Sequence, residues 1–293
     1  MSRTVGLVLH ERRDDVEGEA QSFADQLEQR GVTSIILDEN TPADAIENVE
    51  LAVVLGGDGT MLRAAEFTRG HRVPLLGVNY GHMGFLAELD SSSHADVIET
   101  VSSAKWIIEE RMTIDVSVDY PDGTHISNWA LNEVSIEKGF GSRMIETDLA
   151  VDGTGVSSFK TDAVILSTPT GSTAYNFSAG GPIVWPDVEA IVLIPIAAHA
   201  LFTRPMVVGP KSRLDIRLRS DDAVLWCDGR RKIHAPEGSI ISVYRGSDPV
   251  LLARVHDLPF SWRLVTKFRL PVEGWRYDQQ PRANGDVRIL MEH

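Results

Sequence analysis

Residues 56–60, with the sequence Gly-Gly-Asp-Gly-Thr, constrain the fold of this chain most, because they directly follow the five apolar residues 51–55. An apolar run that ends in glycines is typical of a buried strand that breaks into a tight turn. Glycines have no Cβ, so backbone N–H groups can approach a phosphate closely. The residues from Thr60 onward predict a helix whose first N–H groups and dipole favour an anion. The pattern therefore predicts a phosphate site at the end of a strand.

The carboxylate of Asp58 lies within this turn. A carboxylate repels phosphate unless it binds a metal or accepts the proton of a hydroxyl that is being phosphorylated. The alternative is that Gly-Asp-Gly is merely a turn, in which the aspartate bonds its own backbone. An isolated Gly-Asp-Gly would favour that alternative. The complete strand, turn and helix favour a phosphoryl-transfer site.

Size and charge restrict the class of protein. The chain has 293 residues, enough for two domains, each able to bury its own core. It has 42 acidic and 28 basic residues, a formal charge of −14, which argues against nucleic acid as the main partner. No apolar run approaches the roughly 20 residues needed to cross a bilayer, and the start of the chain does not resemble a signal peptide. One cysteine, Cys227, excludes an intramolecular disulfide, and we expect a cytoplasmic protein with no membrane partner.

The first hundred residues alternate between strand and helix patterns, which predicts a parallel sheet with helices on its faces. Ligands of such sheets bind beyond the carboxyl ends of the strands, where residues 56–60 fall, and the segment 79–86 should lie at the same edge. The expected strands are 5–10, 33–37, 51–55 and 74–78, and the expected helices are 14–30 and 60–68.

Near residue 107 the pattern changes to period-two alternation with turn signals, which predicts a mainly antiparallel second domain. We expect a Rossmann-like α/β domain over 1–106, a β-rich domain over 107–258, a return segment over 259–276 that packs on the first domain, and a polar tail over 277–293. The expected elements of the second domain are strands at 112–120, 130–136, 146–151, 158–167, 213–219, 223–227, 239–244 and 250–254 and one helix at 172–178. Residues 259–270 should be helical and then strand-like.

Two adjacent polar residues, Asn132 and Glu133, interrupt the apolar pattern of 129–136. Neighbouring side chains on a strand point to opposite faces, so at least one of the two should face inward. A buried carboxylate or amide without a partner costs several kcal/mol. Either a ligand hydroxyl or base edge, or a neighbouring backbone amide, would satisfy it, and both alternatives stay open at this point.

A second polar segment, 167–175, has the sequence Ser-Thr-Pro-Thr-Gly-Ser-Thr-Ala-Tyr and follows the apolar residues 163–166. Ser172 or Thr173 could cap a helix whose N-terminus faces a ligand. The alternative is an ordinary capped helix in a Ser/Thr-rich loop that leaves through Gly-Gly-Pro. Neither a Gly-x-Ser-x-Gly pattern, a dinucleotide fingerprint, a P-loop nor a zinc-binding histidine spacing occurs in the sequence.

Taken in order, 56–60, 132–133 and 168–175 with the Gly-Gly-Pro at 180–182 resemble the NAD kinase family. The resemblance covers nearly the whole chain, including 264–270 and 274–276, and Gly-Ser-Thr-Ala-Tyr is its most specific part. It is closest to the actinobacterial branch, which tends to have Asp-Gly-Arg-Arg where this chain has residues 228–231.

This resemblance implies a Rossmann-like first domain, a β-rich second domain and a cleft between them. It implies transfer of a phosphoryl group from ATP or inorganic polyphosphate to the 2′-hydroxyl of the adenosine ribose of NAD, which forms NADP. Magnesium would arrive with the phosphoryl donor, since the sequence shows no dedicated metal cage. The family commonly forms homodimers or homotetramers.

The resemblance also implies residue roles. Asp58 would be the base that takes the 2′-hydroxyl proton, and Gly59 would line the phosphate path. Asn132 and Glu133 would hold the adenine and ribose groups, and Asp162 would contact the nicotinamide end. The remaining binding positions implied are Arg63, Arg143, Lys160 near the phosphates, Thr170, Thr173, Ala174, Tyr175, Asn176, Phe177, Ser178 and Ala197.

Two other functions compete with this one. A dinucleotide sensor without catalysis would not need the carboxylate of Asp58 beside phosphate. Lipid kinases of the diacylglycerol type share Gly-Gly-Asp-Gly-Thr but usually have Asn-Glu directly after it, whereas Met61 and Leu62 follow here. The sequence also shows no exposed amphipathic membrane segment.

Overall fold

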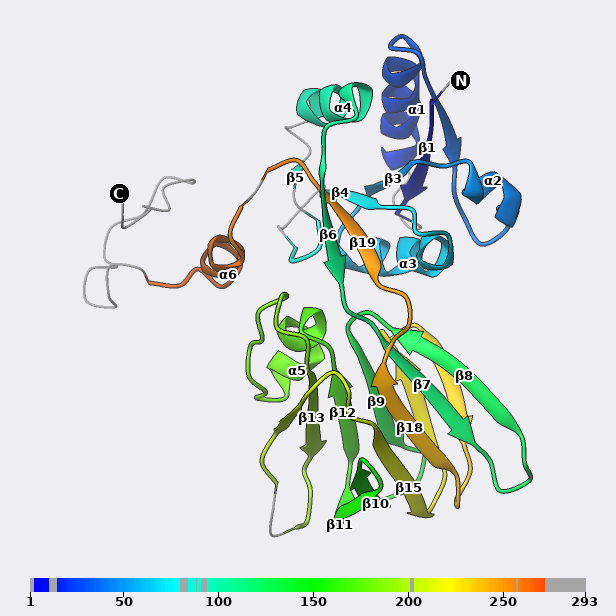
Figure 1. Ribbon diagram of the computed structural model, residues 1–293, viewed down its shortest axis with the longest axis vertical. Helices are drawn as coiled ribbons and strands as arrows, with labels where there is room; N and C mark the ends of the chain where they lie inside the picture. The colour runs from blue at the N-terminus through cyan, green and yellow to red at the C-terminus, as the bar shows by residue number, and fades with distance from the viewer. Residues whose placement is uncertain are drawn as a thin grey trace. The chain divides into compact units, whose positions relative to one another are not determined.

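The computed structural model describes residues 3–10, 15–79, 84–87, 89–90, 94–200, 203–256 and 258–271. The chain divides into two compact units (Figure 1). The first unit consists of Met1–Glu109 and Leu251–His293, and the second consists of Glu110–Val250. Within the described ranges, no helix is long and apolar enough to cross a membrane.

The first unit is built on a seven-stranded sheet with the order β2-β1-β3-β4-β19-β6, in which β5 pairs with β4. The pairs β1/β2, β1/β3, β3/β4, β4/β5 and β4/β19 are parallel, which confirms the predicted Rossmann-like α/β class. The strands are β1 (Arg3–Leu9), β2 (Val32–Ile36), β3 (Leu51–Leu55), β4 (Leu75–Asn79), β5 (Leu89–Asp90), β6 (Ile107–Arg111) and β19 (Val250–Arg254).

Helices cover both faces of this sheet. Because β2 and β4 lie on opposite sides of the pair β1/β3, right-handed crossovers place α1 and α3 on opposite faces. Figure 1 shows α4 beside α1, and Phe23 of α1 packs with Leu7 and Ile98 in the core of the unit. The helices are α1 (Asp15–Glu28), α2 (Ala43–Glu47), α3 (Asp58–Thr68), α4 (His94–Ser103) and α6 (Phe260–Phe268).

The glycine turn after β3 brings the start of α3 close to the end of the strand. Gly57 is the N-cap residue, so the helix begins at Asp58, two residues before the predicted start. A Cβ at Gly56 would lie only 2.3 Å from Oγ1 of Thr60, which requires a glycine there. Asp58 therefore lies in the first helical turn, at the carboxyl end of the sheet.

The second unit is a sandwich of two six-stranded sheets, with the orders β11-β10-β15-β18-β7-β8 and β14-β13-β12-β9-β16-β17. Within the described residues its strand pairs are antiparallel, as predicted, and one apolar core joins residues of both sheets, such as Val116 of β7 and Ile136 of β9. Its remaining strands are β7 (Ile114–Asp119), β8 (His125–Ala130), β9 (Glu133–Lys138), β10 (Ile145–Val151), β11 (Thr154–Thr161), β12 (Ala163–Ser167), β13 (Ile191–Ile196), β14 (Met206–Val208), β15 (Leu214–Ser220), β16 (Ala223–Cys227), β17 (Arg231–Ala235) and β18 (Ile240–Arg245).

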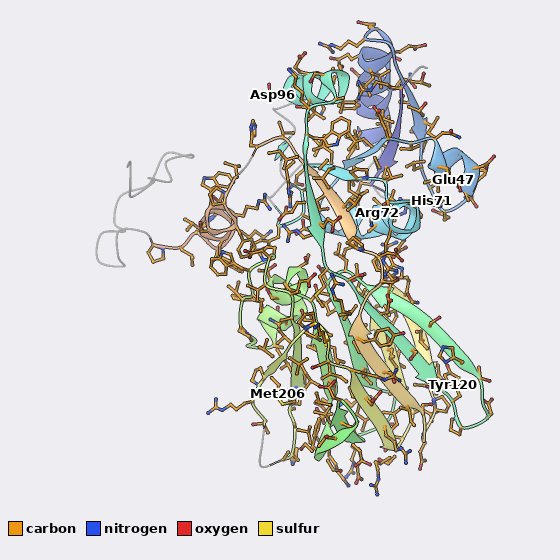
Figure 2. The ribbon with its side chains drawn as sticks, in the orientation of Figure 1. Glu47, His71, Arg72, Asp96, Tyr120 and Met206 are labelled. Carbon is orange, nitrogen blue, oxygen red and sulfur yellow. The ribbon has the colours of Figure 1, made fainter. Side chains whose placement is uncertain are left out.

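A side-chain hydrogen bond also joins the two sheets. Tyr120, labelled in Figure 2, follows β7, and its hydroxyl donates to the backbone carbonyl of His234 on β17. The sequence did not predict the strands β5, β6, β13, β14 and β17, most of β8, or the helices α2 and α4.

Two predicted strands are divided in the structure. The predicted strand 130–136 is wrong as one element, because a bend at Leu131 and Asn132 separates β8 from β9. The physical reason is that the carboxylate of Asp228 accepts hydrogen bonds from the backbone N–H groups of these two residues. The predicted strand 158–167 likewise divides into β11 and β12.

The predicted helix at 172–178 is also different. A 3-10 helix, η3 (Thr170–Thr173), precedes the short α5 (Tyr175–Ser178). The hydroxyl of Ser172 does not cap a helix but exchanges hydrogen bonds with the backbone of Val184, at 3.2 and 2.9 Å. This contact uses the Ser172 hydroxyl, and the helix α5 begins only at Tyr175.

The strand at 250–254 has the predicted residues but belongs to a different sheet. β19 pairs in parallel with β4 of the first unit, whereas the sequence grouped it with the antiparallel strands of 107–258. All five of its residues are buried, as is usual in a parallel sheet covered on both faces. After α6 the chain turns at Arg269, whose φ is 50°, so the strand expected before residue 270 does not form. The predicted tail at 277–293 lies outside the described residues.

Candidate functional site

The carboxylate of Asp58 accepts hydrogen bonds from three consecutive backbone N–H groups. Oδ2 accepts from Phe85 at 3.0 Å, and Oδ1 accepts from Leu86 at 3.1 Å and from Ala87 at 3.5 Å. The carboxylate therefore orients the loop that follows β4, at the edge where the sequence placed the segment 79–86. Residues 80–83 of that segment lie outside the described part of the chain. The alternative that Asp58 bonds only its own backbone is wrong.

Two glycines allow this contact between the loop and α3. A Cβ at Gly84 would lie 1.9 Å from Oδ1 of Asp58, and one at Gly77 would lie 2.7 Å from Cα of Ala87. By contrast, a Cβ at Gly59 would have no heavy atom within 4 Å. Of the roughly four lone-pair directions of a carboxylate, three are used, so Asp58 keeps the capacity to accept one more hydrogen.

Arg63, one turn of α3 further on, lies at the same edge of the sheet. Its guanidinium donates to the carbonyl of Leu9 at 3.2 Å, pairs with Glu39 at 2.9 Å and lies 5.6 Å from the ring centre of Phe67. Leu9 ends β1, so this guanidinium extends along the carboxyl ends of the strands.

In the second unit, the bend at 131–132 and the turn at 168–171 are joined by hydrogen bonds. The N–H of Thr168 donates to the carbonyl of Asn132 at 2.9 Å, and the Thr168 hydroxyl donates to the carbonyl of Leu131 at 2.5 Å. The same hydroxyl accepts from the N–H of Gly171 at 3.0 Å. The structure therefore brings together the two polar segments that the sequence singled out.

Gly171→Ala tests this close contact. A Cβ at this position would lie 2.0 Å from the carbonyl oxygen and 2.7 Å from Cα of Asn132, so one backbone segment must move. We expect the strain, about 1–3 kcal/mol, to weaken binding of the NAD that the sequence resemblance implies as ligand by roughly 5- to 150-fold in isothermal calorimetry. Gly155→Ala is the matched control, because its Cβ would meet no heavy atom within 4 Å. Equal affinities for the two variants would contradict the prediction.

Glu133 begins β9 and is paired with Ser167, with only 8% of its surface exposed. In the described structure its Oε2 is buried and has no hydrogen-bond partner. Burial, and to a smaller extent the charge of Asp228, raise the pKa of Glu133 to about 8, although the Tyr175 backbone N–H acts in the opposite direction. At neutral pH the buried carboxyl group is therefore mainly protonated and can donate a hydrogen bond to a ligand.

Asp228 supports this arrangement, although the sequence pattern pointed to no role for it beyond the family resemblance. Its buried carboxylate accepts from the N–H groups of Leu131 and Asn132, at 3.0 and 2.6 Å, and pairs with Arg231 at 2.7 Å. Desolvation raises the pKa of Asp228, against the effect of these donors. Arg231 lies over the ring of Trp129, 4.3 Å from its centre. The available signal was Asp-Gly directly after the apolar strand β16, which is typical of a hairpin turn.

In the described structure the predicted residues of 170–178 lie next to Glu133, and they differ from one another in how far they are buried. Asn176 is fully buried, and its amide donates to the carbonyls of Ser172 and Pro182, both at 2.9 Å. Tyr175 and Phe177 are about 40% exposed, at 41% and 42%. The carbonyl of Thr170 accepts from the hydroxyl of Thr173 at 3.3 Å. Ala174 is the N-cap residue of α5, and Ser178 is its last residue.

A third group of predicted residues lies elsewhere in the second unit. Asp162 precedes β12, whereas Thr168 follows it, so the two lie at opposite ends of one strand. Asp162 pairs with Lys138 at 2.7 Å, and Lys138 also donates to the carbonyl of Arg143 at 3.1 Å. The other predicted members of this group are Lys160, which pairs with Glu146 at 3.4 Å, and Ala197, whose φ is 52°.

A buried parallel strand leads through a glycine turn into a helix whose first turn holds a carboxylate. This arrangement is typical of a nucleotide-binding phosphotransferase. Residues 5–105 match the family model for the ATP-NAD kinase N-terminal domain, and residues 131–255 match that for the ATP-NAD kinase C-terminal domain. The chain belongs to the NAD kinase family.

Relatives and solved structures agree with this assignment. The chain is 49% identical to NAD kinase 2 of Streptomyces avermitilis, with 82% of this chain and 80% of the relative covered. It is 44% identical to the NAD kinase of Thermobifida fusca, with 97% and 94% covered. An NAD kinase from Archaeoglobus fulgidus in complex with ATP superposes with a TM-score of 0.73 at 27% identity, covering 91% of this chain and 98% of the other. Yeast NADH kinase complexed with NADH shares the fold, with a TM-score of 0.83 at 23% identity and coverage of 97% and 90%.

Proposed function

We propose that Asp58 is the general base with which this NAD kinase phosphorylates the 2′-hydroxyl of the adenosine ribose of NAD. The carboxylate accepts the hydroxyl proton while the hydroxyl oxygen bonds to the terminal phosphorus of the donor. The bond between that phosphorus and the bridging oxygen breaks, so ATP leaves as ADP and the acceptor becomes NADP.

The observation that supports this role is the way in which Asp58 is held. Three consecutive N–H groups fix its carboxylate at the carboxyl end of β3, where open-sheet proteins bind ligands, and Gly59 leaves open space beside it. A base must be held in one position to abstract a proton from a bound hydroxyl. The same glycine turn offers backbone N–H groups to the donor phosphates.

For the acceptor, we propose that Asn132 and Glu133 hold the adenosine part of NAD and that residues 170–178 form the cradle around it. Glu133 presents a buried oxygen without a partner in the described structure, which a ligand group would satisfy. Asp162, Lys160, Arg143 and Ala197 remain proposed contacts of the nicotinamide and phosphate groups.

The donor carries a divalent ion in this proposal, and we expect magnesium. No group of three or more metal-binding side chains occurs within the described residues. Magnesium keeps several waters and is commonly held through substrate phosphates, so an ion that arrives on the donor phosphates would need no cage of protein side chains here. When bound, the ion neutralises charge on the transferring phosphoryl group.

One assay tests the proposed reaction, namely NADP formation from NAD with ATP and magnesium. Competition at fixed NAD with GTP and with inorganic polyphosphate then tests the donor, because a site that binds only the phosphate chain should accept all three. Absence of NADP with every donor would contradict the reaction. Assembly as a homodimer or homotetramer and a cytoplasmic location are further proposals, and light scattering tests the first of them.

A further inference from the structure

The loop 84–87, which holds the Asp58 carboxylate, is itself held by a buried arginine at the end of β19. Nη1 of Arg254, at the end of β19, donates to the carbonyl oxygen of Leu86 at 2.8 Å. The N–H of the same Leu86 donates to Oδ1 of Asp58 at 3.1 Å. One residue of the loop therefore joins the arginine to the aspartate.

Arg254 is fixed in this position by its own partner. Its side chain is only 4% exposed, and its Nε donates to the carboxylate of Glu109 at 2.8 Å. Glu109 lies on β6, the strand next to β19 in the sheet, so the guanidinium is attached to the rigid part of the unit. A planar guanidinium can use separate N–H groups for a carboxylate and a carbonyl at once, which a lysine ammonium does less well.

The other side of the loop packs against α6. The ring of Phe85 lies 6.0 Å from that of Phe260 and 5.6 Å from that of Phe268, measured between ring centres. These aromatic contacts fix the side chain before Leu86 but make no hydrogen bond to its peptide groups. Among the described residues, the hydrogen bond from Arg254 is the contact that orients the Leu86 carbonyl.

We propose that Arg254 is a positioning residue for catalysis, which acts on the Asp58 carboxylate through the Leu86 backbone. This inference rests on the proposed role of Asp58 as the base. Without the guanidinium, the Leu86 carbonyl loses its buried donor and the three N–H groups can shift. A misplacement of a catalytic group by about 1 Å can cost on the order of 10²-fold in rate.

The test is Arg254→Met, which keeps an unbranched side chain and removes the guanidinium. We expect kcat to fall by roughly 10- to 100-fold with little change in KM for NAD. Arg254→Lys, which can still donate one hydrogen bond, should recover part of kcat. Arg3→Met is the matched control, because Arg3 also pairs with a carboxylate, Glu50, at 2.6 Å.

Arg3 is a suitable control because its hydrogen bonds resemble those of Arg254, whereas its position in the sheet is different. It donates to the carbonyls of Val101 and Ser102, at 2.7 and 2.6 Å. It begins β1, whereas Asp58 follows the opposite end of the neighbouring β3. Arg3→Met should lower the thermal unfolding midpoint without changing kcat.

A double-mutant cycle with Asp58→Asn separates positioning from general destabilisation. If Arg254 acts through Asp58, Arg254→Met should cause no further loss of kcat in the Asp58→Asn background. An equal loss in both backgrounds, or an unchanged kcat in Arg254→Met alone, would overturn the inference. A nearly active Asp58→Asn would instead overturn the role of the base, and the two failures are thereby distinguished.

Discussion

Replacement of Asp58 by asparagine is expected to lower kcat by about 10²- to 10⁴-fold, the usual effect of removing a general base. The amide keeps the shape of the side chain but cannot accept the 2′-hydroxyl proton. NAD affinity should remain largely intact, because the proposed adenosine-binding residues lie in the second unit. Steady-state kinetics and calorimetry measure the two quantities. More than about a tenth of the original kcat in the variant would exclude Asp58 as the base.

Asp58→Asn needs a control for stability, because the Asp58 carboxylate also accepts hydrogen bonds from the loop 84–87. In asparagine, the amide NH₂ group must face at least one of the N–H donors, which costs a hydrogen bond and about 1–3 kcal/mol of stability. Asp152→Asn is a suitable control, since that carboxylate accepts from the N–H of Arg213 at 2.9 Å in a turn of the second unit. It should lose stability by a similar mechanism and keep kcat.

Gly84→Ala complements this pair of variants. The added Cβ would lie 1.9 Å from Oδ1 of Asp58, so it displaces the carboxylate without changing its chemistry. Loss of kcat in both Asp58→Asn and Gly84→Ala would show that the chemistry and the position of the group are both required. A fully active Gly84→Ala would show that the loop can move without consequence.

The sequence predicted those parts of the site that depend on local chain geometry. An apolar run followed by Gly-Gly-Asp-Gly-Thr predicts a strand, a tight turn and a helix, and the structure has β3, the turn and α3 in this order. The family was also predicted correctly, because the order of its motifs along the chain is a property of the sequence.

The remaining parts of the site depend on contacts between distant residues, which periodicity does not encode. The bend at Asn132 exists because Asp228, 96 residues away, binds its N–H group. The N–H donors to Asp58 lie 27 to 29 residues downstream, and Arg254 lies 168 residues from Leu86. The sheet that contains β19 could not be predicted for the same reason, since an apolar five-residue strand fits either sheet.

The raised pKa of Glu133 predicts that the free energy of unfolding depends strongly on pH. Burial raises this pKa from an ordinary value of 4.5 to about 8, so the folded protein binds a proton that the unfolded chain releases near pH 4.5. The protonated carboxyl is favourable below the unfolded pKa, and this contribution is lost as the pH rises towards 8. The unfolding free energy should therefore fall between about pH 4.5 and 8.

Glu133→Gln isolates this contribution, because glutamine has nearly the same shape and does not titrate. Each unit of pKa shift corresponds to about 1.4 kcal/mol, so the wild-type chain should lose on the order of 3–5 kcal/mol relative to the variant between pH 5 and 9. Denaturant titrations of both proteins across this range measure the difference, with the signal of each compact unit followed separately. Parallel stability curves would show that Glu133 is ionised in the folded protein at neutral pH. In that case, its buried oxygen could only accept hydrogen bonds, and the adenosine would have to supply the donor.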